Sequence, residues 1–461
     1  MAPPDPLPVP DPTAPDPIAT DVEDGFTLVA AGDVLAPSGL AVHDRNRDLV
    51  ALFRAGDVTV ANFEAPAVDL RETGHEPVSG GPGWPLVRVP PELPQSLRDW
   101  GFDMVGLANN HMVDWGPRGA RQTVRLLDEA GIASAGYGET RAAARAPVVL
   151  PTPKGRVALL SVTASFRESS AAMDAFGVTP SVPGLSVLRA RPVDVVTRAQ
   201  FEVLREIDAQ HNTNGNRFAP PTGGDDLVYR GTRFRAGEEP GTVYDVDAVD
   251  EADLLRNIRE AKQRTGFVVV SVHNHEEPGA PVPPLQDEGS AWPTGMPPDF
   301  LQRFARAAID HGADVIVGHG PHVLLGIEVY RGRPIYYSLG DLFGAVEQVD
   351  LVTDAAPVGF DAARETVADY YERWWTYYAR DRTLYHSLVT ESVFRDNRLA
   401  EIRLHPVDLG ADRRLADRGF PETPSPELAT AILTRLQRLS EPFGTKITVD
   451  GGVGRIHLAG S

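Results

Sequence analysis

The strongest constraint on the fold is a set of short apolar runs that each lead into polar, titratable residues. Runs of this length and composition are typical of buried strands. They are found at 26–31, 57–61, 102–108, 267–272, 314–317 and 335–339. The polar residues that follow these runs are Asp33, Glu64, Asn109 to His111, His273 to Glu277, His319 with His322, and Asp341. Because sites of α/β proteins form where strands end at one sheet edge, we expect these side chains to form one site.

Segments with apolar residues at helical spacing lie between the strands, which predicts an α/β layered fold. We expect helices at 117–130, 251–264, 298–311 and 426–439, and further strands near 393–404 and 446–458. Two segments interrupt this pattern, and we interpret them as insertions into a single domain that spans 26–461. The first, about 166–245, has little strand signal beyond a helix expected from Pro192 to Gln210. The second is about 345–390.

The second insertion contains an aromatic stripe. Tyr370, Trp374, Tyr377 and Tyr378 would share one face of a helix. Such stripes are more often core or a subunit contact. The alternative is a wall that grips an apolar substrate, with Trp374 and Trp375 as contacts.

The N-terminal segment 1–25 alternates proline with acidic residues, and we expect a disordered arm. It lacks the basic start and apolar stretch of a secretory signal, and no apolar window long enough for a membrane span occurs, which favours a cytoplasmic location and no membrane partner. The net charge of −20 argues against nucleic acid as a partner. The absence of cysteine excludes thiolate metal ligands and thiol nucleophiles.

The polar residues at the strand ends are a mixture of carboxylate, amide and imidazole groups. That mixture suits Mn²⁺, Mg²⁺, Ca²⁺, Zn²⁺ or iron rather than a soft metal. His273 and His275 are two residues apart, so both would point to one side of an extended segment. A pair of histidines on the turn Gly318–His322 fits metal or acid–base groups better than incidental residues of a surface turn.

Six segments, in the same order along about residues 26–344, resemble the motifs of the CapA family of poly-γ-glutamate capsule biosynthesis. They are Gly32-Asp33, Ala61–Glu64, Ala108–His111 with Asp114 and Gly116, His273–Glu277, Gly318–His322, and Tyr337–Gly340. The resemblance implies a calcineurin-like metallophosphoesterase fold, a two-layered β sandwich flanked by helices, with a metal at the strand ends. By motif position it implies Asp33, Glu64, Asn110, His273 and His319 as metal ligands or near neighbours. It implies His111 and His322 as acid–base groups.

The sequence departs from the family pattern at four places. Asp33 is followed by Val34-Leu35 instead of Asp-x-His, and Gly320 stands where the family has a histidine. Asp341 replaces the expected asparagine, and His273–Glu277 replaces His-Trp-Gly-x-Glu. Two metal ions that clamp a phosphoryl group need full ligand sets. The departures therefore favour one divalent cation (Ca²⁺, Mg²⁺ or Mn²⁺), no organic cofactor, and proton transfer by histidine–aspartate pairs.

Within the family, such a site resembles that of the metal-dependent peptide epimerases of lasso-peptide biosynthesis. This resemblance implies a peptide partner, such as a ribosomal precursor, whose C-terminal Cα centre is inverted by two bases. The proton carriers would be His111, His275 and His322, oriented by Asp114 or Asp341. The expected substrate contacts are Asn109, Glu276, Glu277, Trp374 and Trp375.

Two other classes of function are compatible with the same residues. The first is a metal-dependent hydrolase that acts on a phosphate ester or on a γ-glutamyl or peptide bond. The second is a non-catalytic polymer-binding protein, which the net charge of −20 disfavours because poly-glutamate is itself anionic.

Overall fold

The computed structural model describes residues 20–36, 40–72, 74–78, 86–211, 224–278, 295–344, 361, 363–370, 373, 381–456 and 458. Residues 1–19 of the expected N-terminal arm lie outside this part. Thr20 and Val22, which were expected to belong to the arm, are buried against the domain.

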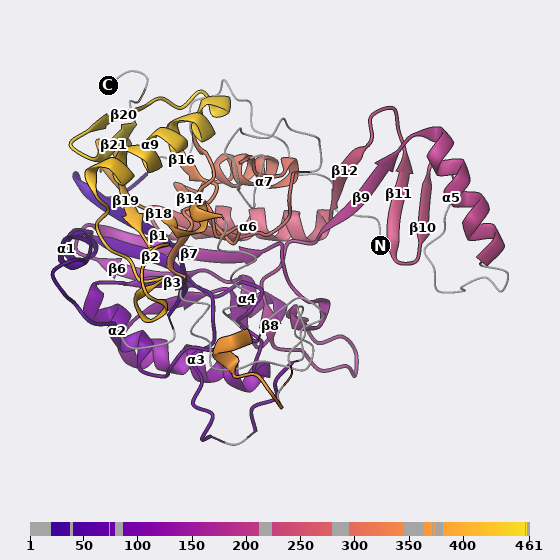
Figure 1. The fold of residues 1–461 in the computed structure, drawn as a ribbon, viewed down its shortest axis with the longest axis horizontal. Helices are drawn as coiled ribbons and strands as arrows, with labels where there is room; N and C mark the ends of the chain where they lie inside the picture. Colours follow the sequence, from indigo (N-terminus) through magenta and orange to yellow (C-terminus); the bar gives the residue numbers. More distant parts are fainter. Residues whose placement is uncertain are drawn as a thin grey trace.

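Two large sheets form the body of the molecule (Figure 1). The first has nine strands. In spatial order they are β20 (Ile447–Asp450), β21 (Val453–Ile456), β19 (Arg398–Asp408), β18 (His386–Arg395), β1 (Phe26–Leu35), β2 (Val58–Phe63), β3 (Met104–Gly106) and β4 (Ala133–Ala135), with β17 (Asp341–Gly344) paired to β1. The second sheet has six strands: β15 (Ile327–Tyr330), β16 (Arg333–Tyr336), β14 (Val315–His319), β13 (Phe267–His273), β7 (Gly155–Thr163) and β6 (Val148–Thr152).

The two sheets face each other across one apolar cluster. Leu28 and Val58 of the first sheet belong to the same buried cluster as Leu159, Val269 and Val317 of the second. The alternate residues of the same strands point to the outer faces, where helices cover them. The architecture is therefore α/β, with two sheets packed together between helical layers.

Helices cover the outer face of each sheet. The first sheet is covered by α1 (Arg47–Ala55), α2 (Leu93–Trp100) and α3 (Gly116–Ala130), and the second by α6 (Ala248–Arg264) and α7 (Asp299–Asp310). The helix α9 (Pro426–Ser440) packs on the antiparallel end of the first sheet. The four helices expected from the sequence are thus confirmed as α3, α6, α7 and α9, and the strands expected near 393–404 and 446–458 are confirmed as β18–β19 and β20–β21.

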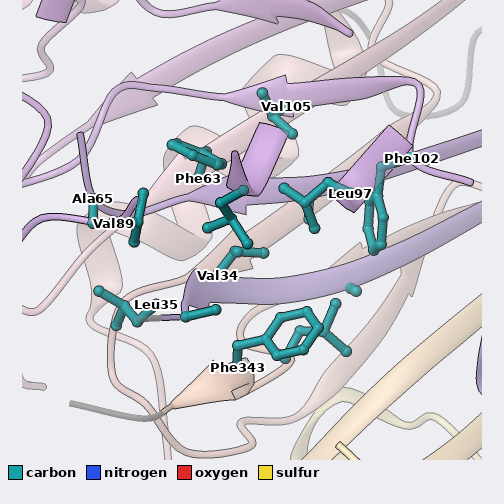
Figure 2. Close-up of a cluster of buried hydrophobic side chains, with 14 of the residues drawn as sticks. Val34, Leu35, Phe63, Ala65, Val89, Leu97, Phe102, Val105 and Phe343 are labelled. Atoms are coloured by element: carbon teal, nitrogen blue, oxygen red, sulfur yellow. The ribbon is translucent and has the colours of Figure 1, made fainter. Parts of the chain in front are cut away.

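The outer cluster of the first sheet anchors the strand ends that carry the polar residues. Figure 2 shows Val34, Phe63 and Phe343 among the side chains of this cluster. Val34 directly follows Asp33, and Phe63 directly precedes Glu64. Both carboxylates are therefore attached to backbone that cannot shift without disturbing the core.

A smaller sheet projects from the body, at the right of Figure 1. Its strand order is β10 (Asp226–Tyr229), β11 (Thr232–Ala236), β9 (Ala190–Val196) and β12 (Gly241–Val246), and α5 (Arg198–His211) packs on it. The helix expected from Pro192 to Gln210 is wrong at its start, because Pro192 lies in β9. These strands are short and only partly buried, so they lack the apolar runs that reveal core strands.

The remaining elements are short. They are α4 (Arg141–Arg145) and a two-stranded ladder of β5 (Tyr137–Gly138) and β8 (Gly184–Leu185). In the part of the chain that the structure describes, no helix has both the length and the apolar character to cross a membrane.

Candidate metal centre

The carboxyl ends of parallel strands bring the polar residues together. β1, β2 and β3 are parallel neighbours in the first sheet, and β7, β13 and β14 in the second. The pairing of β13 with β14 places His273 beside His319. The structure thus brings these two residues together at the strand ends, and their membership of one functional site stays a prediction.

Two aspartates are placed differently from the prediction. β1 does not end at Asp33 but continues to Leu35, with irregular register on both sides of Asp33. Asp341 does not end a strand. It begins β17, which belongs to the first sheet rather than to the second sheet of the preceding strand β16, and there it pairs with Asp33. A strand irregularity re-aims a side chain, which lets Asp33 point to the site from within a strand.

Asp33, His273 and His319 form the first group of donor atoms. Asp33 Oδ1 lies 3.5 Å from His319 Nδ1 and 3.9 Å from His273 Nδ1, and the two nitrogens are 3.0 Å apart. All three side chains are buried. Carboxylate and imidazole donors this close can bind one divalent cation.

Glu64, His275 and His322 form a second group of donor atoms beside the first. Glu64 Oε1 lies 3.8 Å from His275 Nε2, and Glu64 Oε2 lies 4.0 Å from His322 Nδ1. A third combination of Asp33, Glu64, His322 and Asp341 also places its donor atoms within 4.8 Å of one another. The described residues can therefore hold at least one cation.

The surroundings of Glu64 test whether a cation fits. Its side chain is fully buried, yet neither carboxylate oxygen accepts a hydrogen bond from a described residue. His273 Nε2, which also makes no hydrogen bond with a described residue, lies 3.5 Å from Glu64 Oε1. A buried carboxylate without partners is costly. A bound cation would remove that cost, so the residues fit a metal.

Burial changes the acid–base properties of these ligands in opposite directions. Burial and the nearby charge of Asp341 raise the pKa of Asp33 to about 7, and burial with the charge of Asp33 raises the pKa of Glu64 well above its usual range. Burial lowers the pKa of His319 to about 3 and holds the pKa of His273 well below its ordinary value. The histidines are therefore neutral at pH 7, which is the form that binds metals.

The raised pKa of Asp33 predicts that this residue destabilises the metal-free protein at neutral pH. Its folded-state pKa of about 7 exceeds the usual aspartate pKa of 3.8, so the stability that its proton contributes is lost as pH rises between those values. Without metal, Asp33→Asn is therefore expected to gain free energy of unfolding relative to the unmodified protein as pH rises from about 4 to about 8. Urea denaturation in EDTA measures this gap.

The metal provides the control for that prediction. At pH 8 with saturating Mn²⁺, the order should reverse, because only the unmodified protein gains the full binding energy. A gap that does not change with pH in EDTA would contradict the raised pKa of Asp33.

Two histidine–aspartate pairs flank the cluster. His111 Nδ1 lies 2.8 Å from Asp114 Oδ2 in the loop after β3. His322 Nδ1 lies 2.7 Å from Asp341 Oδ1, and His322 follows β14. Burial alone would lower the pKa of His322, but Asp341 and Asp33 outweigh it and raise the pKa to about 9. His322 can thus donate a proton at pH 7, and its φ of 59° is a strained conformation typical of functional sites.

The backbone conformation at position 320 requires a glycine. Its φ is +115°, and a Cβ there would lie 2.6 Å from the Asn274 carbonyl oxygen. Its N–H donates a hydrogen bond to Asp33 Oδ2 at 2.9 Å. In this site a histidine could not replace Gly320 without moving the loop that carries His273 to Glu276.

The remaining predicted residues have different positions. Asn110 is buried and its Oδ1 accepts no hydrogen bond from a described residue, which is compatible with the predicted ligand role. Asn109 is fully buried, and its side chain bonds to Asn62, Phe63 and the backbone of the His111 loop; its contact with substrate stays a prediction. Glu276 accepts a hydrogen bond from Ser165, and Glu277 is exposed. Trp374 and Trp375 lie outside the described residues.

Several residues of the site carried no predicted role. Asn62 Nδ2 donates to Asp33 Oδ1 at 2.7 Å, and Ser271 Oγ lies 2.7 Å from His319 Nε2. Ser165 and Arg167 reach the site from the loop after β7. Asn62 directly precedes the Phe63-Glu64 pair, which was a usable signal. The loop after β7 carries no such signal, because serine and arginine are common in surface loops.

The arrangement suits metal-assisted acid–base chemistry. Buried carboxylates and neutral imidazoles can bind a cation, while the two histidine–aspartate pairs can transfer protons beside it.

Comparisons with known proteins agree on one family. Residues 27–345 match the family described as "Bacterial capsule synthesis protein PGA_cap". The protein y4uA of Sinorhizobium fredii, described as uncharacterized, is 42% identical over 458 residues and covers 95% of each chain. The "Capsule biosynthesis protein CapA" of Bacillus anthracis is 26% identical over 54% of this chain and 42% of its own. The "PGA biosynthesis protein CapA" of Bacillus subtilis is 26% identical over 63% of this chain and 54% of its own.

Proposed function

The chain belongs to the PGA_cap family of bacterial capsule synthesis proteins, and from this premise we propose that it is a metal-dependent hydrolase. Its substrate is an amide bond of a glutamate-containing chain. The observation that carries the proposal is Glu64, a buried carboxylate without hydrogen bonds among three histidines and two aspartates. The two facing sheets support the further proposal of a calcineurin-like metallophosphoesterase fold.

The residues that would hold the cation are Asp33, His273 and His319, with Glu64 and His275 beside them. A divalent cation supplies Lewis-acid polarisation of a carbonyl and lowers the pKa of water. Gly320 N–H and Asn62 Nδ2 fix the Asp33 carboxylate from two sides. Ser271 fixes the His319 ring.

Proton transfer is assigned to the two histidine–aspartate pairs. His322 is protonated at pH 7 because Asp341 and Asp33 raise its pKa to about 9, so it acts as the general acid for the leaving amine. Asp114 orients His111 on the other side of the cluster. The choice of an amide bond rests on the names of relatives, which include a "Probable polyglutamine synthesis accessory protein" of Mycobacterium tuberculosis.

A second candidate function is Cα epimerisation of a peptide. One observation favours it: the site has two histidine–aspartate pairs, one in the loop after β3 and one that joins the loop after β14 to β17, and inversion by two bases needs two such proton carriers. A lasso-type precursor peptide would be the substrate in this reading.

One experiment separates the candidates. The full-length protein, loaded with Mn²⁺, Mg²⁺ or Ca²⁺, is incubated with γ-linked and α-linked glutamate oligomers, in oxygen-18 water and in D₂O. Mass spectrometry should detect shortened chains with oxygen-18 at the new carboxyl ends. Carbon-bound deuterium in chains of unchanged length would instead identify an epimerase.

Bis-p-nitrophenyl phosphate tests the remaining hydrolase class in parallel. Turnover of this phosphate ester, without any change in the glutamate oligomers, would overturn the choice of an amide bond and identify a phosphoesterase. Elemental analysis of the purified protein should find bound divalent metal, and its absence after loading would contradict a metal-dependent mechanism.

A further inference from the structure

The loop after β7 reaches both halves of the candidate site, although no motif marks it. Ser165 Oγ accepts a hydrogen bond from the His275 backbone N–H at 2.6 Å and donates one to Glu276 Oε2 at 2.7 Å. Two residues later, the guanidinium Nη2 of Arg167 lies 3.3 Å from Asp114 Oδ1. A single short loop of the second sheet thus contacts a carboxylate that belongs to the first sheet.

The Asp114 carboxylate faces a cationic side chain from outside its own loop. It is fully buried. Its Oδ2 accepts from His111 Nδ1 at 2.8 Å and from the Val87 N–H at 3.0 Å. Its Oδ1 makes no hydrogen bond with a residue that the structure describes, and Arg167 is an ion-pair partner that faces it. Such a partner offsets part of the cost of burying a carboxylate.

Arg167 is itself held in place. Its Nη1 donates to the Val78 carbonyl oxygen at 3.2 Å, and the Val78 N–H donates to the Asp114 carbonyl oxygen at 2.8 Å. The guanidinium therefore braces the side chain of Asp114 and the segment that packs on its backbone. The Arg167 side chain is only 21% exposed, which favours a structural charge over a mobile surface residue.

We propose that Arg167 is a positioning residue that holds Asp114 in place, so that Asp114 fixes the His111 ring for proton transfer. Asp114 Oδ2 accepts the Val87 N–H and acts as the acceptor toward His111 as well, so His111 Nδ1 carries the proton and Nε2 is directed away from Asp114. Groups that orient a reacting histidine in this way contribute about 10–100-fold to activity without contact with substrate. The role of His111 in proton transfer rests on the proposed function, whereas the tautomer of its ring does not.

The test compares Arg167→Gln, Arg167→Lys and the matched control Arg121→Gln. Arg121 makes an exposed ion pair with Glu139 on the surface. Arg167→Gln is expected to lower kcat about 10–100-fold with KM and metal content unchanged. Arg167→Lys should recover part of kcat, since it keeps the charge but loses the planar fork. Arg121→Gln should match the unmodified protein.

Long-range ¹H–¹⁵N NMR of the histidine rings gives a readout that does not need a substrate. The unmodified protein should show His111 with its proton on Nδ1, and Arg167→Gln should lose that fixed tautomer. An unchanged His111 signal together with an unchanged kcat would overturn the proposal. A raised KM with unchanged kcat would also overturn it, because Arg167 would then bind the substrate. Absence of turnover in the unmodified protein would count against the proposed function alone, and the NMR signal would still decide the role of Arg167.

Discussion

Replacing Glu64 with glutamine is expected to lower the affinity for divalent metal by at least about a hundredfold and to remove the activity. The amide cannot supply the negative charge that a bound cation requires. The same change removes a buried carboxyl group whose pKa is raised well above its usual range, so metal-free Glu64→Gln should unfold at higher urea concentration than the unmodified protein at neutral pH. Isothermal titration with Mn²⁺ and urea denaturation in EDTA measure the two effects.

Glu139→Gln is the matched control, because Glu139 is an exposed surface carboxylate. It should change neither metal affinity nor activity. Unaltered Mn²⁺ binding by Glu64→Gln would show that this carboxylate is not a ligand, and would remove the main support for the metal centre.

Replacing His322 with glutamine is expected to lower kcat by about 10²–10⁴-fold, the usual contribution of general acid–base catalysis. Metal should still bind, because Asp33, His273 and His319 remain.

Asp341→Asn should act differently. Asp341 is the main reason that the pKa of His322 is raised to about 9, so its loss should move the alkaline limit of activity from near pH 9 toward lower pH.

His405→Gln provides the control for this pair. His405 also lies beside a carboxylate, Glu391 at 3.4 Å, but on β19 away from the candidate ligands. Its replacement should leave the pH–rate profile unchanged. An alkaline limit that stays in place in Asp341→Asn would mean that His322 is not the general acid.

The layered α/β core could be predicted because its strands are buried on both faces. Runs such as Phe267–Val270 are continuously apolar, and that composition is a local property of the chain. The helices α3, α6, α7 and α9 were predictable for the same reason, since their apolar periodicity needs no knowledge of partners. β9 to β12 could not be found in this way, because their residues are mostly half-buried.

The candidate site was predictable as a collection of residues, but not as a set of roles. Asn109 was predicted as a substrate contact. In the structure it is fully buried and its side chain braces the His111 loop. Asp341 looked like the end of one strand, yet it starts another in the opposite sheet, where it meets both Asp33 and His322. Sequence order does not reveal which sheet a strand joins, so these partners were hidden.

The sequence by itself determined that polar, metal-binding side chains gather where buried strands end, because strand patterns and glycine turns are encoded locally. Only the tertiary structure decided which atoms meet. The facing sheets bring Asp33 to His319, leave Glu64 without a hydrogen bond, and set Arg167 against Asp114. Such contacts depend on sheet pairing and loop geometry between residues far apart in the chain, and burial at those contacts, rather than residue type, sets the charge states on which the chemistry depends.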